Sequence, residues 1–414
     1  MFHKERGSVW LLARIALGAI CLASCGSPAL DTDVHQYLRL AVALGANDPD
    51  SIDYYYGPSD WVADIRKDPP RLDEIRREAR QLASRLTAQK QSRAVRLGQQ
   101  VRAIAVRADQ LLGAKQNFDQ ETEAYFGVTA PPIDPNALNQ VRARISQLLG
   151  GRGSLTQRYF IFDQKFLVPP ERLQTVMARA IQGCRDQTRD HLRLPFGESV
   201  TIEYVHNKPW SAFSRYAGNF HSVIQVNADL PLTVDRALQL ACHEGYPGHH
   251  AFNVLRELQF VRQNHWLEWM VQPAFSSASL VSESLATIAT DIAFPEPERL
   301  RFERDALFPL AGLNRNEAAR YDQVERLIDQ LQSAEPTIAR DFLDGKLEWA
   351  RAAEALEEQV LMAHPETTLK YMNEYRSYMI TYTLGRDLAA RKVHSWQRYA
   401  QLITDPDAAD TIKR

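Results

Sequence analysis

Hydrophobic positions recur at helical spacing through most of the chain, and strand-like segments are few. We predict helices where apolar residues return every three or four positions. These segments are 31–45, 73–113 with a break near Gln89, 138–150, 169–191, 314–331, 337–342, 348–362 and 366–396. Only 200–204 and 221–227 are predicted as strands. The pattern therefore predicts a mainly α fold of the α+β class with a small antiparallel β-sheet.

The composition is that of a soluble globular protein with no excess of either charge. Of the 414 residues, 45% are hydrophobic and 24% are charged, which is typical of a chain with a substantial core. The net charge of −2 at pH 7 argues against nucleic acid as a partner, because nucleic-acid binding uses a basic surface. We expect an N-terminal helical region (25–195) and a second region (196–414) that together form one continuous domain.

The first residues are typical of an export signal. Three basic residues precede an apolar stretch, 15–23, which is far too short to cross a bilayer. It leads into Leu-Ala-Ser-Cys25, which is similar to a bacterial lipobox with Cys25 as the lipidated residue. We therefore predict a lipoprotein signal peptide over 1–24 and a lipid anchor, most simply in the outer membrane facing the periplasm. An ordinary secretory signal followed by a chance cysteine is the alternative.

Beyond the signal, only Cys184 and Cys242 remain as possible disulfide partners. The expected compartment permits a disulfide. Cys242 directly precedes His243 on a segment that must pack, however, so we expect a buried free thiol there.

The candidate chemistry is concentrated in the segment 243–250, whose sequence is HEGYPGHH. Neutral imidazole is a common metal ligand, and a Glu beside a His ligand is found in zinc hydrolases. The usual spacing in such enzymes, H-E-x-x-H, places both His on one helical face with the Glu as general base. Here Pro247 stands where the second His would be.

A bend at Pro247-Gly248 would restore convergence of the imidazoles. On a straight helix His249 would be rotated by about 240° from His243, and His250 would lie about 10.5 Å along the axis. Ligands of one zinc ion lie a few Å apart, because Zn–N bonds are about 2.0–2.1 Å long. Proline lacks the backbone donor and glycine accepts unusual backbone angles, so the pair can supply a bulge. We therefore rank His249 above His250 as second ligand. The simpler alternative is a helix that ends here, followed by two surface histidines.

Glu283 is the third candidate ligand. It is the only charged residue between positions 272 and 290, in a segment rich in Ala, Ser and aliphatic residues. An ionised carboxylate in such surroundings is costly unless it is paired with a cation or a metal. A Glu on a helix after the His pair fits a site of two His, one Glu and a water. The alternative is a Glu on the polar face of this helix.

These segments resemble the H-E-x-x-P-G-H signature of the domain of unknown function 885 family, bacterial proteins assigned as zincin-like metallopeptidases. The acidic E-G-W-A motif of the family corresponds in place to 283–286, which keeps the Glu and the Ala. Its late S-Y-x-x-G element corresponds to 381–385, and its extended segment ending in Asn corresponds to 221–227. The resemblance covers roughly 204–385. It implies a helical zincin-like fold with the sheet beside the active-site helix, and a catalytic region within 196–414.

The resemblance and the chemistry assign the same roles. His243, His249 and Glu283 would hold Zn²⁺, leaving a fourth position for water, and Glu244 would accept the proton of that water. Tyr382 is the candidate donor to the developing oxyanion. The alternative for Tyr382 is a packed aromatic face, because tyrosines recur at helical spacing from 371 to 382.

Two further segments bear on substrate binding. The strand that ends at Asn227 could form the edge on which an extended peptide docks, with Asn227 as a substrate-binding residue. Alternatively, it is one arm of an ordinary hairpin with 200–204. We expect the tyrosines at 54–56 to pack in the core or in a loop and not to line the cleft.

The sequence thus predicts a lipid-anchored zinc-dependent hydrolase of the gluzincin type, acting in the periplasm on peptide or related amide bonds. The competing prediction is a non-catalytic metal-binding lipoprotein with a binding or structural role. A non-peptide amide or ester of the cell envelope is a third possible target.

Overall fold

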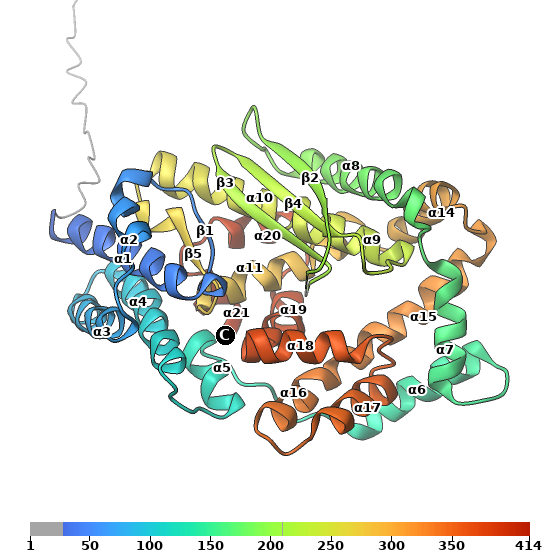
Figure 1. Cartoon of the computed structure of the whole chain (residues 1–414). Helices are drawn as coiled ribbons and strands as arrows, with labels where there is room; N and C mark the ends of the chain where they lie inside the picture. Colours follow the sequence, from blue (N-terminus) through green and yellow to red (C-terminus); the bar gives the residue numbers. More distant parts are fainter. Residues whose placement is uncertain (1–27, 209) are drawn as a thin grey trace, which may run out of the picture.

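The computed structural model describes residues 28–208 and 210–414 and is mostly helical (Figure 1). The predicted signal peptide and Cys25 lie outside these residues. The prediction of a mainly α fold with a small sheet is confirmed. None of the helices in the described ranges combines the length and the apolar character needed to cross a bilayer.

The first four N-terminal helices lie together at the left of Figure 1: α1 (Pro28–Asn47), α2 (Ala63–Lys67), α3 (Leu72–Thr87) and α4 (Ser92–Leu111). The next helix, α5 (Phe118–Phe126), packs against α4 and against the later helices α11 (Ser277–Thr287) and α16 (Glu335–Leu343). The predicted break near Gln89 is confirmed, since α3 ends at Thr87 and α4 begins at Ser92. The apolar faces of α1, α3 and α4 share one buried cluster that includes Leu38 and Leu82.

A second cluster joins the middle of the chain to the segments that follow it. This core includes Ile145 of α6 (Pro135–Leu149), Phe162 of α7 (Leu155–Asp163) and Val176 of α8 (Leu173–His191). The same core contains Leu238 and Val324 from later helices. Regions far apart in sequence therefore share one apolar interior.

The main sheet has the strand order β2-β4-β3 and is mixed. Its strands are β2 (Ser199–Val205), β3 (Ala212–Gly218) and β4 (His221–Asn227). β3 and β4 are antiparallel, as expected for neighbours along the chain, but β2 and β4 are parallel. The hairpin of 200–204 with 221–227 is therefore wrong, because β3 intervenes in the chain and pairs with the other edge of β4. We did not predict β3, because apolar and polar residues alternate only weakly along it and the polar Ser214 is one of its buried positions.

A second, two-stranded antiparallel sheet pairs β1 (Ile52–Tyr55) with β5 (Val271–Pro273). It joins the N-terminal helices to the segment before α11. Both strands are too short for a clear pattern, and neither was predicted from the sequence.

Helices form the whole C-terminal part of the chain. They are α11 (Ser277–Thr287), α12 (Ala289–Ala293), α13 (Glu298–Phe302), α14 (Phe308–Ala311), α15 (Ala318–Leu331), α16 (Glu335–Leu343), α17 (Trp349–Gln359), α18 (Pro365–Tyr375), α19 (Ile380–Lys392), α20 (Trp396–Ile403) and α21 (Ala408–Lys413).

The expected continuous helix over 366–396 is wrong, because the chain breaks at Arg376. This residue has φ 49° and begins a short 3₁₀ turn (Arg376–Met379) that separates α18 from α19. The buried carboxylate of Glu121 accepts hydrogen bonds from Arg376 Nε (2.8 Å), Ser377 N (3.2 Å) and Ser377 Oγ (2.8 Å). A tertiary contact with α5 thus fixes a backbone angle that local sequence does not favour.

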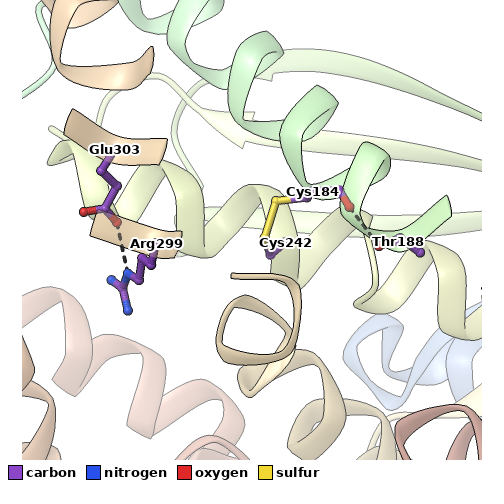
Figure 2. Close-up of a disulfide and its surroundings, with 5 residues drawn as sticks. All are labelled: Cys184, Thr188, Cys242, Arg299 and Glu303. Atoms are coloured by element: carbon purple, nitrogen blue, oxygen red, sulfur yellow. Dashed lines mark hydrogen bonds and ion pairs between the residues drawn. A yellow bond between two sulfur atoms is a disulfide. The ribbon is translucent and has the colours of Figure 1, made fainter. Parts of the chain in front are cut away.

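The prediction of a free thiol at Cys242 is also wrong. Cys242 forms a disulfide with Cys184 of α8, with the Cα atoms 5.4 Å apart (Figure 2). Both side chains are fully buried where α8 packs on α9 (Val234–Leu240) and on η5 (Ala241–Gly245), the π-helical turn that continues α9. The register of α8 on α9 places the two residues face to face, and the sequence alone does not reveal that register.

Candidate metal centre

The segment 243–250 is bent as the motif predicts. His243 lies in η5, and a new helix, α10 (His249–Arg256), begins at His249 after the chain turns at Tyr246–Gly248. The Gly248 N–H donates to the Cys242 carbonyl at 3.0 Å. A Cβ at position 248 would lie 2.0 Å from the His243 carbonyl oxygen, so only glycine allows this close backbone approach.

The bend brings the three predicted ligand atoms together. His243 Nε2 lies 3.1 Å from His249 Nε2, and Glu283 Oε2 lies 3.3 Å from the first and 3.4 Å from the second. In a tetrahedral zinc site with bonds of about 2.0–2.1 Å, ligand atoms are about 3.3–3.4 Å apart. The spacing of the three atoms therefore fits a shared zinc ion.

The chemistry of Glu283 supports the same fit. Its buried Oε2 accepts no hydrogen bond from any described residue, while its Oε1 accepts a 2.8 Å hydrogen bond from the Tyr378 hydroxyl. A buried carboxylate oxygen without a donor is costly. Oε2 faces the two imidazoles and is thus the atom that a cation would satisfy.

The electrostatics of the pocket favour positive charge. Burial alone lowers the pKa of His249, but Glu283 and then Glu244 raise it to about 9. Burial alone raises the pKa of Glu283, but the two imidazoles hold it well below its usual range. Without a metal, the carboxylates favour a protonated His249. A bound divalent cation would balance the same negative charge.

Neighbouring side chains fix the orientation of the ligands. His249 Nδ1 lies 3.1 Å from Ser282 Oγ, and Tyr378 holds Glu283 from the other side. Metal-binding residues are commonly oriented by such partners. Neither Ser282 nor Tyr378 was assigned a role from the sequence. The sequence could have indicated them only by position: Ser282 is next to Glu283, and Tyr378 lies one helical turn before Tyr382.

Gly385 explains how α19 reaches this site. A Cβ on Gly385 would lie 2.5 Å from Ser284 Oγ, so the absence of a side chain lets α19 pack closely against α11. That packing places Tyr378 and Tyr382 beside Glu283. The glycine of the 381–385 element therefore has a structural role.

A cavity of about 300 Å³ lies beside these residues. Both predicted catalytic residues line it, and Glu244 offers a carboxylate oxygen within 4.8 Å of the ligand nitrogens of His243 and His249. The hydroxyl of Tyr382 is 3.2 Å from that of Tyr371. Burial first, and then Glu283, raises the pKa of Tyr382 well above its usual range, so this phenol stays protonated and can donate.

The aromatic-face alternative for Tyr382 holds in part. Tyr371 and Tyr375 stack with ring centroids 4.6 Å apart, and Tyr378 and Tyr382 meet edge to face at 5.9 Å. All four line the cavity as well as packing on one another.

Tyr54 also lines the cavity, with its hydroxyl 3.0 Å from Asn253 Oδ1, so the expectation that this tyrosine avoids the cleft is wrong.

His250 is not a metal ligand, which corrects the alternative left open by the sequence. It is fully buried, with Nε2 3.1 Å from Glu198 Oε2 and Nδ1 2.8 Å from Ser222 Oγ. Its neighbour Tyr246 donates to the same Glu198 oxygen at 2.5 Å. Both imidazole nitrogens are therefore satisfied within the protein, because α10 points consecutive side chains in different directions.

Asn227 does not face the cavity, and its predicted role in substrate binding is not supported by its position. Its Nδ2 donates to the carbonyl oxygens of Lys208 (3.0 Å) and Trp210 (3.1 Å), and its Oδ1 accepts from Asp229 N (3.1 Å). It thus closes the loop between β2 and β3. β4 is also the central strand of its sheet, so its edges are already paired, and the edge strand at the cavity is β3.

No family model matches the chain, and no curated protein matches it. A crystal structure from Colwellia psychrerythraea, described as that of "the putative lipoprotein", is similar with a TM-score of 0.49 and 13% sequence identity. The match covers 93% of this chain and 75% of that chain. What this chain does must therefore be inferred from its own residues.

Proposed function

We propose that this protein is a zinc-dependent hydrolase, a metallopeptidase of the gluzincin type, that cleaves peptide or related amide bonds. The observation that carries the proposal is the convergence of His243 Nε2, His249 Nε2 and Glu283 Oε2 within 3.1–3.4 Å of one another. A zinc ion held by these residues supplies the Lewis acidity that makes water a nucleophile near neutral pH.

The chain itself supplies the acid–base and oxyanion groups. Glu244 is placed to accept the proton of the attacking water and to pass it to the leaving amine. Tyr382 is placed to donate a hydrogen bond to the oxyanion that forms at the carbonyl. Both line the cavity beside the candidate ligands, an arrangement that suits metal-assisted amide hydrolysis.

The edge strand β3 supports a peptide as substrate. Ala212, Phe213 and Ser214 of β3 line the cavity, and β3 is an edge strand of the sheet that the described residues form. An extended peptide can add to such an edge by main-chain hydrogen bonds.

The resemblance to the domain of unknown function 885 family and the lipobox-like Leu-Ala-Ser-Cys25 complete the proposal. They support a lipid anchor in the cell envelope, with the proposed active site in the periplasm. The outer membrane is the proposed location, because the residue after Cys25 is Gly26 and not Asp.

The decisive variant is Glu244→Gln. It removes the base but none of the candidate ligands, so we expect turnover of a peptide library to fall by about 10²–10⁴-fold while zinc content is unchanged. Glu171→Gln, at an exposed position in a short 3₁₀ turn, is the matched control and should retain activity. Equal activity of Glu244→Gln and the unaltered protein would refute the mechanism.

The same assay separates the competing functions. A metal-binding lipoprotein without catalysis would bind zinc but cleave neither peptides nor amide-containing cell-wall fragments. Glu244 favours an enzyme, since a structural zinc site needs no base. Cleavage of cell-wall amides alone would identify the non-peptide target.

A further inference from the structure

Asp53 is placed in the cavity by an irregularity of β1. Ile52 pairs with Pro273 and Tyr54 pairs with Gln272, so Asp53 is an extra residue opposite β5. Such bulges re-aim a side chain and are frequent beside active sites. Asp53 accordingly lines the cavity that contains the candidate metal ligands.

Within the described ranges, the carboxylate of Asp53 makes no hydrogen bond and no ion pair with another side chain. Burial and then Glu283 raise the pKa of Asp53 to about 7, and His249 opposes them. An acid in this position gains from a cationic partner, and no Lys or Arg is among the described residues that line the cavity.

The cavity as a whole carries negative charge. Its described lining residues include four acids and neither Lys nor Arg. Glu283 and Glu244 have the roles proposed above, which leaves Asp50 and Asp53 for the substrate. Asp50 accepts a 3.1 Å hydrogen bond from the Tyr375 hydroxyl. Burial, followed by Asp50 and other nearby acids, raises the pKa of Tyr375.

Aromatic rings complete a setting for an organic cation. Tyr54, Trp210, Phe213 and Tyr375 line the same cavity, and the faces of such rings attract ammonium and guanidinium groups. A second metal ion fits less well. Among the described residues, Asp53 belongs to no group of His, Cys, Asp or Glu side chains whose ligand atoms are close enough to hold a metal ion.

We propose that Asp53 determines specificity by binding a cationic amine or guanidinium of the substrate close to the scissile bond. This inference rests on the proposed hydrolase function and names its substrate class. The cation is either the free α-ammonium group of a peptide or a Lys or Arg side chain. In both cases it forms a charge-assisted contact with the unpartnered carboxylate.

The test uses four otherwise identical hexapeptides, with Lys or acetyl-lysine and with a free or acetylated amino terminus. Their binding is measured by calorimetry on the zinc-loaded Glu244→Gln protein, which does not turn them over. We expect the preferred cation to improve binding by about 10–100-fold over its acetylated twin, the usual effect of a hydrogen bond to a charged group. If acetylation of the lysine weakens binding, the cation is the side chain; if acetylation of the amino terminus weakens it, the cation is the α-ammonium group. Equal binding of all four peptides would overturn the inference.

Adding Asp53→Asn to this protein should abolish the preference, whereas Asp60→Asn, an exposed residue of the turn after β1, should retain it. Zinc content and thermal unfolding check that each variant is folded, and the peptide comparison stands without the variants. A preference that survives Asp53→Asn would contradict the assignment. Charge-selective binding without turnover by the unaltered protein would refute the hydrolase alone, and turnover without charge preference would refute only the role of Asp53.

Discussion

Two adjacent histidines, His249 and His250, belong to two different buried polar groups. The His250 group is closed, because Glu198 and Ser222 satisfy both imidazole nitrogens. The His249 group is open, because its Nε2 faces His243 and an oxygen of Glu283 that accepts no hydrogen bond within the part of the chain that the structure describes. Burial and residue type do not separate the groups. The difference lies in which polar atoms still lack a partner, and this distinguishes a structural histidine from a candidate ligand.

The largest expected effect is the loss of zinc affinity when His249 is replaced, and the matched replacement of His250 tests the other group. Zinc binding is worth about 10–16 kcal/mol in a four-ligand site, so His249→Gln should lower zinc affinity by more than about 100-fold. His250→Gln should keep zinc and lower stability by about 1–3 kcal/mol, because Glu198 loses a partner. Elemental analysis and thermal unfolding of both variants check this. Loss of zinc in His250→Gln but not in His249→Gln would reverse the assignment.

The disulfide stabilises the backbone that both groups share. Cys242 precedes His243, and Cys184 precedes Arg185, which donates to Glu198 Oε1 at 2.6 Å. A disulfide that closes a long loop typically contributes about 2–4 kcal/mol. The double variant Cys184→Ser/Cys242→Ser should therefore unfold at lower denaturant concentration and be insensitive to reductant. If the unaltered protein showed no change on reduction, the disulfide would have no such role.

The smallest expected effect comes from the hydroxyl that orients Glu283. Tyr378→Phe removes the 2.8 Å hydrogen bond to Oε1 but leaves the ligand atoms, so zinc affinity should fall by about 10–100-fold. Competition with a zinc-binding dye measures this. The matched variant on the closed side is Tyr246→Phe, which should change stability and leave zinc affinity unaltered. Equal zinc affinities of both variants would mean that Tyr378 does not act through Glu283.

Local sequence predicted what depends on local rules. The helices, the break between α3 and α4, and the bend that brings His249 to His243 follow from periodicity and from the properties of Pro247 and Gly248. Glu283 was predicted because a lone acid in an apolar helix needs a partner. That its free oxygen faces both imidazoles was not visible in the sequence.

The features that were not predicted from the sequence depend on contacts between distant segments. The Cys184–Cys242 disulfide requires the register of α8 on α9, the break at Arg376 depends on Glu121, and the parallel pairing of β2 depends on the position of β3. Asp53 enters the cavity only through the bulge opposite β5. In each case the deciding partner lies far away in sequence, so no local pattern could indicate it.

The most direct test is anomalous X-ray diffraction at the zinc absorption edge, on crystals of protein purified without chelator. One anomalous peak should lie between His243 Nε2, His249 Nε2 and Glu283 Oε2, at about 2 Å from each. A peak at the Glu198–His250 group instead, or no peak after zinc is added, would contradict the metal centre and the hydrolase that depends on it.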